Sequence, residues 1–82
     1  MKKMFSVYDS KAQVFSNPFT SHNTFTALRD FQAAALDGNS QISQYPEDFV
    51  LFEIGHFEDE TGVLSPCLPV NLGNADQFTS RS

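Results

Sequence analysis

The chain has 82 residues, 40% of them hydrophobic and nine of them Phe, which suffices for one small domain with a modest core. Its formal net charge is −5 and it has only five Lys and Arg residues, which argues against an extensive phosphate-binding surface. A single cysteine, Cys67, excludes an internal disulfide and a Cys-based zinc cluster, and it fits a reducing compartment. No apolar stretch reaches the roughly 18 residues that cross a bilayer, so we expect no membrane role.

The first part of the chain predicts a hairpin followed by a helix. Residues 3–9 alternate and contain good β formers, and residues 12–15 predict a short second strand that Pro18 ends. Residues 25–36 lack Gly and Pro and predict a helix capped by Asn23 or Thr24. The apolar face of this helix is expected to consist of Phe25, Leu28, Phe31 and Ala35.

Gly38 is expected to end the helix in the left-handed conformation. The polar residues 39–45 predict a connection that holds at most one helical turn.

The second part of the chain predicts the centre of the sheet. Residues 49–57 form the longest apolar run and predict a central strand with both of its faces at least partly covered. Residues 58–62 predict a hairpin loop with Gly62 at positive φ, and residues 63–65 should return antiparallel. Pro66 and Pro69 then place the rest of this arm, to residue 72, at a sheet edge or away from the sheet.

These elements predict an α+β fold, with a small antiparallel or mixed sheet of three to four strands and one amphipathic helix packed on one face. We expect a single domain over residues 1–73 and a frayed polar tail over residues 74–82.

The residues that could carry catalysis or bind a metal do not form a recognisable pattern. His56 and Glu53 fall on opposite faces of a regular strand, and three adjacent acids at 58–60 lack the further spaced ligands of a calcium loop. Cys67 has no neighbouring base in the sequence to activate it. We therefore expect no enzyme, no metal and no cofactor. A hydrolase or nuclease would require His22, His56 and the acids to meet in the fold.

Two sets of residues are candidates for binding a partner. Lys2, Lys3, Lys11 and Arg29, with Tyr8, predict a weak surface for single-stranded nucleic acid, and the alternative is scattered lysines over a Phe-rich core. The apolar arm predicts a protein interface, either with another protein or with a second copy in a homo-oligomer. Its residues are Leu64, Leu68, Val70 and Leu72.

Several phrases in fixed order resemble the small non-structural protein of gokushoviruses, which are microviruses with single-stranded DNA genomes. They are MFSVYDSKA at residues 4–12, NPF at 17–19, ALRDF at 27–31 and, most specifically, YPEDFVLFEIGHFEDETG at 45–62. The resemblance covers about residues 4–72.

The resemblance implies a bacteriophage protein that is made in the host cytoplasm and is absent from the capsid. It also implies a DNA-binding role in the switch from double-stranded intermediates to single-stranded genomes. The leading hypothesis is thus an accessory factor in single-stranded DNA production, acting on DNA or through phage or host replication proteins. The alternative is an acidic adaptor or host-factor inhibitor, with a homodimer as one form.

Overall fold

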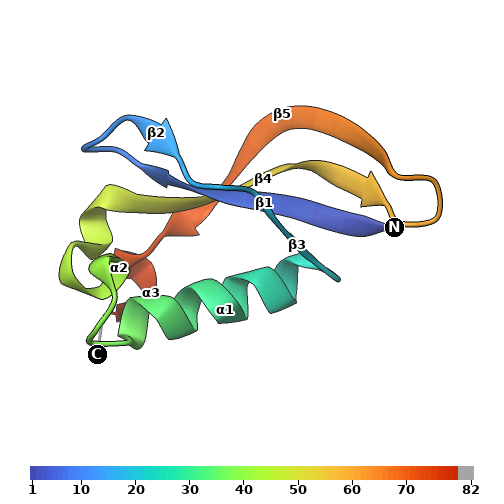
Figure 1. Ribbon diagram of the computed structural model, residues 1–82. Helices are drawn as coiled ribbons and strands as arrows, with labels where there is room; N and C mark the ends of the chain where they lie inside the picture. Colours follow the sequence, from blue (N-terminus) through green and yellow to red (C-terminus); the bar gives the residue numbers. More distant parts are fainter. Residues whose placement is uncertain (80–82) are drawn as a thin grey trace.

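The protein is an antiparallel sheet with helices on one of its faces (Figure 1), and the computed structural model describes residues 1–79. In chain order the strands and helices are β1 (Lys2–Asp9), β2 (Val14–Phe15), β3 (Phe19–Ser21), α1 (Thr24–Leu36), α2 (Gln41–Gln44), the 3-10 turn η1 (Pro46–Asp48), β4 (Phe49–Glu58), β5 (Val63–Asn74) and α3 (Asp76–Thr79).

The strand β4 lies at the centre of the sheet, as its apolar sequence predicts. It pairs with β1 on one side and β5 on the other, and all pairings are antiparallel. The hairpin loop between β4 and β5 has Gly62 at φ 79°, also as predicted. The α+β class and the antiparallel order are therefore confirmed.

The sheet contains five strands in its described part, more than the three to four expected. The additional strand is β3, which the sequence patterns did not predict. Both β2 and β3 pair with the same edge of β1, so they act as one edge strand interrupted at residues 16–18. Pro18 explains the interruption because it lacks the N–H group that a sheet ladder needs.

The core lies between α1 and one face of the sheet. Ala27, Phe31 and Ala35, spaced four residues apart, are the buried residues of α1, and they face Phe5 and Leu51 of the central strands. The two alanines allow the helix to approach the sheet closely, and Phe31 fills the space between them.

The ends of α1 differ in how well they were predicted. The side chain of Asn23 accepts a hydrogen bond from the Thr26 N–H at 2.8 Å, which confirms the N-cap. At the other end the helix stops at Asp37, whose backbone is extended and whose N–H donates to the Ala34 carbonyl. Gly38 has no positive φ, so its predicted role as a left-handed cap is wrong.

The apolar face of α1 was predicted incorrectly at one position. Phe25 is 82% exposed, whereas Phe31 is 3% exposed. Phe25 lies in the first turn of α1, outside the buried face of the helix. That face is formed by Ala27, Phe31 and Ala35.

Residues 74–79, expected to begin a frayed tail, are packed. Asn74 ends β5, the Ala75 side chain is fully buried, and the Phe78 ring contacts the Phe31 ring edge to face with centroids 6.0 Å apart. The tail prediction is therefore wrong for these residues, and residues 80–82 lie outside the described part. The segment is mostly polar, and two apolar side chains, Ala75 and Phe78, pack it against the core. Its composition alone therefore predicted a frayed tail.

Replacing Phe31 by Ala should lower the free energy of unfolding by about 3–5 kcal/mol, because it removes a buried ring from the centre of the core. Phe25→Ala is the matched control on the same helix and should change it by less than about 0.5 kcal/mol. Urea denaturation followed by circular dichroism measures both. Equal losses for the two variants would contradict the one-sided core.

Candidate functional site: the open face of the sheet

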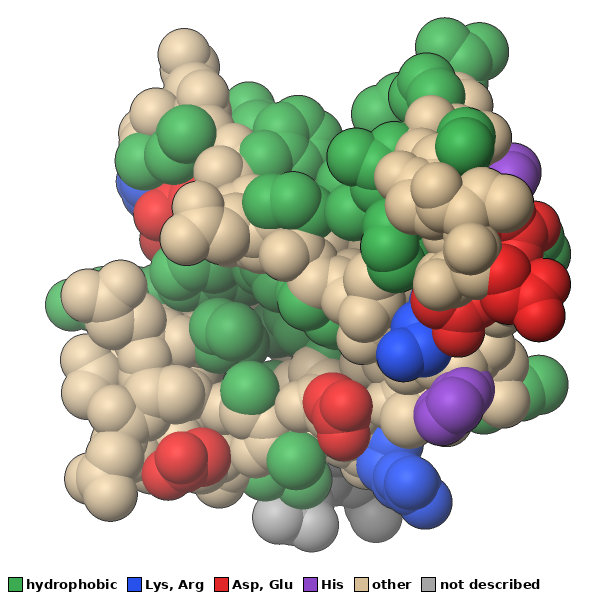
Figure 2. All heavy atoms as spheres, turned by 45° about the vertical axis from the view of Figure 1, so that its right-hand side comes forward, with side chains coloured by type: hydrophobic (Ala, Val, Ile, Leu, Met, Phe, Trp, Pro, Cys, Tyr) green, Lys and Arg blue, Asp and Glu red, His purple; other side chains and the backbone are tan. Residues whose placement is uncertain are grey.

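Among residues 1–79 no helix covers the face of the sheet opposite α1 (Figure 1). On β1, Phe5 and Val7 pack in or against the core, so Met4, Ser6 and Tyr8 point to the other side because strand side chains alternate. Figure 2 shows hydrophobic side chains above the level of the sheet, between two projecting parts of the surface. We call this surface the open face and define it by the following residues: Met4, Tyr8, Phe15, Phe52, Ile54 and Leu64.

Three aromatic rings form a cluster at one end of the open face. Tyr8 and Phe15 are directly paired across β1 and β2, and their ring centroids are 4.7 Å apart. Phe52 of β4 contacts both rings edge to face, with centroids 6.2 Å from Tyr8 and 5.4 Å from Phe15. Phe15 is nevertheless 43% exposed, so the cluster presents ring surface to solvent.

The chain between β2 and β3 covers the middle of β1. Ser6 is buried, and its hydroxyl donates to the Ser16 carbonyl at 2.8 Å. The Val7 N–H donates to the Ser16 hydroxyl at 3.0 Å. These bonds hold the interrupted edge strand in place beside the aromatic cluster.

The other end of the open face is an apolar hollow of about 280 Å³. Met4, Ile54, Gly55, Leu64 and Pro66 line it, together with Ser65. Gly55 lies directly against the Ser65 carbonyl and within 3.1 Å of the Pro66 Cα, measured from the position that a Cβ would occupy. The glycine therefore permits β4 and β5 to approach closely at the floor of the hollow.

Beyond Pro66, β5 bulges away from β4. Glu53 pairs with Val70 and Gly55 pairs with Pro66, so residues 67–69 of β5 oppose Ile54 alone. Leu68 lies in this bulge and is 88% exposed. The bulge and the two prolines interrupt the hydrogen-bonding edge that β5 would otherwise present, which is a common protection against edge-to-edge pairing.

The four residues of the predicted interface arm lie in different environments in the structure. Leu64 and Leu68 are exposed, and Leu64 lines the hollow. Val70 is half-exposed opposite Glu53, and Leu72 packs against the core below the sheet. The four residues therefore do not form one surface, because the bulges in β5 change which residues share a face.

The predicted basic surface is not brought together. Lys2 and Lys3 lie at the start of β1, and Lys11 lies in the turn beyond its end, about 20 Å away along the strand. Lys3 pairs with Glu53 at 3.7 Å, and Arg29 is exposed on α1, across the sheet from the open face. Tyr8 belongs to the aromatic cluster.

Sequence reasoning missed Met4, Phe15, Phe52 and Ile54 as members of the open face. The period-two alternation of β1 was the available signal for Met4 and Tyr8. Phe52 and Ile54 required the register between β1 and β4, which contains a bulge at Ile54.

Metal-binding clusters and membrane-spanning helices were both sought in the part of the chain that the structure describes. In residues 1–79 no group of three or more His, Cys, Asp or Glu side chains is placed to hold a metal ion. The Cys67 thiol is exposed and lies 3.8 Å from the Glu53 carbonyl oxygen. Among the same residues no helix has both the length and the apolar character that crossing a membrane requires.

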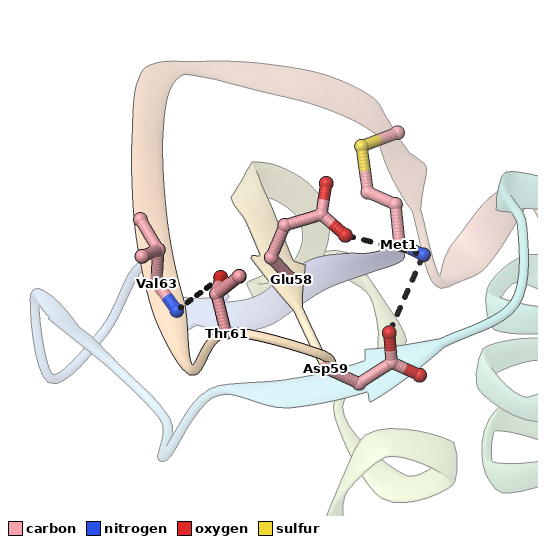
Figure 3. A network of polar contacts seen from close by, with 5 residues as sticks. All are labelled: Met1, Glu58, Asp59, Thr61 and Val63. Atoms are coloured by element: carbon pink, nitrogen blue, oxygen red, sulfur yellow. Dashed lines mark hydrogen bonds and ion pairs between the residues drawn. The ribbon is translucent and has the colours of Figure 1, made fainter.

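The N-terminal amine is held at the β4–β5 loop (Figure 3). It lies 3.6 Å from a Glu58 carboxylate oxygen and 3.5 Å from an Asp59 carboxylate oxygen. A hydrogen bond from the backbone of Asp59, and then the positive amine, hold the pKa of the Asp59 carboxyl below its ordinary value of 3.8.

Comparison with known proteins identifies the family. A family model described as phage ORF5 protein matches residues 2–78. The chain belongs to the phage ORF5 protein family. It is also 33% identical over 80 residues to Protein ORF5 of Chlamydia phage 1. The match covers 90% of this chain and 83% of that protein. These findings confirm the resemblance to a small microvirus protein, and no solved structure matches the chain.

Gly55→Ala should destabilise the protein by about 1–3 kcal/mol, because the added methyl group overlaps the backbone of β5 and pushes the two strands apart. Gly38→Ala is the matched control, since Gly38 has open space around it and no positive φ. The control should be neutral or stabilising by up to about 1 kcal/mol. Urea titration measures both, and an equal response of the two variants would contradict the close approach at Gly55.

Asp59→Asn should reduce the loss of unfolding free energy that the protein shows as the pH falls below 3.8. The pKa of Asp59 is lowered in the folded state, so its ionised carboxylate stabilises the fold above pH 3.8. This stabilisation is lost as the pH falls through the lower folded pKa. Unfolding midpoints measured from pH 5 to pH 2 test this, with Glu60→Gln in the same loop as a control. An unchanged profile for Asp59→Asn would contradict both the backbone hydrogen bond and the contact with the amine as causes of the lowered pKa.

Proposed function

We propose that this ORF5 protein is a non-enzymatic accessory factor in the production of the phage's single-stranded DNA genome. It acts in the host cytoplasm through contact with phage or host replication proteins, which bind the open face. Membership of the phage ORF5 family supports the phage context.

The observation that carries this proposal is the apolar character of the open face. The helices use the opposite face of the sheet for the core, so the aromatic cluster and the apolar hollow are left to solvent. Contiguous exposed apolar surface on a small domain marks a site for binding another protein. Leu64, at 61% exposed, contributes a side chain that the core does not use.

The arrangement of charge supports contact with protein more than contact with DNA. Single-stranded DNA binding combines aromatic stacking with a positive groove that follows the phosphates. The rings of Tyr8 and Phe15 provide a stacking surface, and this observation favours weak direct DNA contact as the second candidate. The lysines, however, lie at opposite ends of β1, and Lys3 is paired with Glu53.

Titration of a fluorescent single-stranded oligonucleotide at low salt separates the two candidates. We expect no change in anisotropy up to tens of micromolar protein, because the lysines of residues 1–79 form no continuous positive surface along the open face. Saturable binding that falls with salt and is lost in Lys11→Gln would instead establish the second candidate.

A phage carrying Leu64→Ser tests the role in the infected cell. We expect the ratio of single-stranded to double-stranded viral DNA to fall several-fold, because a polar side chain weakens the partner contact without altering the core. Phe25→Ser, which changes an even more exposed side chain on α1, is the control and should leave the ratio unchanged. An unchanged ratio in Leu64→Ser would contradict the proposal, provided that the variant accumulates normally.

A further inference from the structure

All ten carboxylates of the chain lie away from the open face, although the net charge is −5. Asp9 shares the face of Phe5 and Val7, and Glu53 pairs with Lys3 on that same side of the sheet. The others lie on the helix side of the sheet or in the helices and turns around it, and they are Asp30, Asp37, Glu47, Asp48, Glu58, Asp59, Glu60 and Asp76.

Among the charged residues of the described strands, only Lys2 shares the open face. It lies two residues before Met4 and pairs with Phe57, beside Leu64 at the hairpin end of the face. The open face is therefore a nearly uncharged surface on an acidic protein.

This distribution of charge favours a second copy of the chain as an occupant. Two copies that meet through their helices and turns bring carboxylates against carboxylates, which is unfavourable for a chain of net charge −5. Two copies that meet through their open faces bring apolar side chains against apolar side chains, with every carboxylate outside the contact.

The shape of the face also suits a second copy. β2 pairs with the Tyr8 end of β1, and the first half of β5 pairs with the opposite end of β4, so the two segments occupy diagonally opposite corners of the sheet. Both segments rise above the level of β1 and β4 (Figure 1). A two-fold axis that lies between two such sheets and runs across their strands places the raised corners of each copy over the low corners of the other, as in the packing of twisted sheets. The same axis brings the aromatic cluster of each copy to the end where the other copy has its hollow.

The size of the face corresponds to a weak, reversible contact. The ten residues of β4 are about 33 Å long, and the three strands β1, β4 and β5 are together about 15 Å wide. Covering this area on two copies removes roughly 1,000 Å² from water, which is about the least that a specific interface buries. A dissociation constant on the order of 10 µM follows from an interface of this size.

We infer that the open faces of two copies pack against each other in the free protein, so that a partner protein reaches the face only by displacing the second copy. This inference rests on the proposed function, because it states how access to the partner-binding surface is controlled.

Sedimentation velocity of the full chain from about 1 to about 200 µM tests the pairing, since this range spans the expected dissociation constant. The mass should rise with concentration from the 9.2 kDa of one chain toward twice that value. A monomer at every concentration would overturn the inference and leave the face to a different protein alone.

Two matched variants identify the surface that is used. Leu64→Glu places a carboxylate on the open face and should weaken the pairing about tenfold or more. Phe25→Glu, at a still more exposed position on α1, should leave the pairing unchanged. Circular dichroism verifies that both variants are folded. Equal effects of the two variants on the pairing would overturn the inference.

Shielding of the face is measured separately with the dye 8-anilinonaphthalene-1-sulfonate, which binds exposed apolar surface. At saturating dye, the fluorescence per chain should rise at least about twofold on dilution, with the same midpoint as the sedimentation data, because dissociation uncovers the face. Fluorescence per chain that does not depend on protein concentration would overturn the inference.

Failure of the inference and failure of the proposed function remain distinguishable. A chain that stays monomeric while the Leu64→Ser phage loses single-stranded DNA keeps the proposed function and overturns the inference. A chain that pairs through the open face while the Leu64→Ser phage makes single-stranded DNA normally overturns the proposed function, and the pairing of copies stands.

Discussion

The packing of α1 against one face of the sheet is the contact on which the rest of this small protein depends. Phe31 lies between two alanines of the helix and meets Phe5 and Leu51, all of them buried. Among residues 1–79 α1 is the one long amphipathic helix, and it covers one face of the five-stranded sheet. The short α3 completes the same core by placing Phe78 against Phe31.

The opposite face is left open as a direct consequence. Its aromatic rings cover part of one another, and the chain between β2 and β3 buries Ser6, but the rings and the apolar hollow still meet solvent. The bulge and the two prolines of β5 interrupt the edge next to this surface, which disfavours unspecific strand pairing. An open face beside an interrupted edge is suited to binding through side chains.

The lysines of the described residues do not gather on the open face. Lys2 and Lys3 lie at the start of β1, where Lys3 pairs with Glu53 on the other side of the sheet, and Lys11 lies in the turn beyond the end of β1. The family membership places the chain among phage ORF5 proteins, and the surface provides the chemical basis for the partner that we propose. DNA contact through the aromatic rings would lack a row of lysines beside them, which is why we propose a protein as the partner of the open face.

Local patterns in the sequence were sufficient to identify the central strand, the hairpin at Gly62, the N-cap Asn23 and most of α1, because these depend on neighbouring residues. They also identified Leu64 and Leu68 as exposed apolar residues. The burial of Ala75, the exposure of Phe25 and the separation of Lys11 from Lys2 depended on which elements meet in space. The open face likewise became visible only in the tertiary structure. The bulges at Ile54 and at residues 67–69 shift the strand register, and no local sequence pattern predicted these bulges.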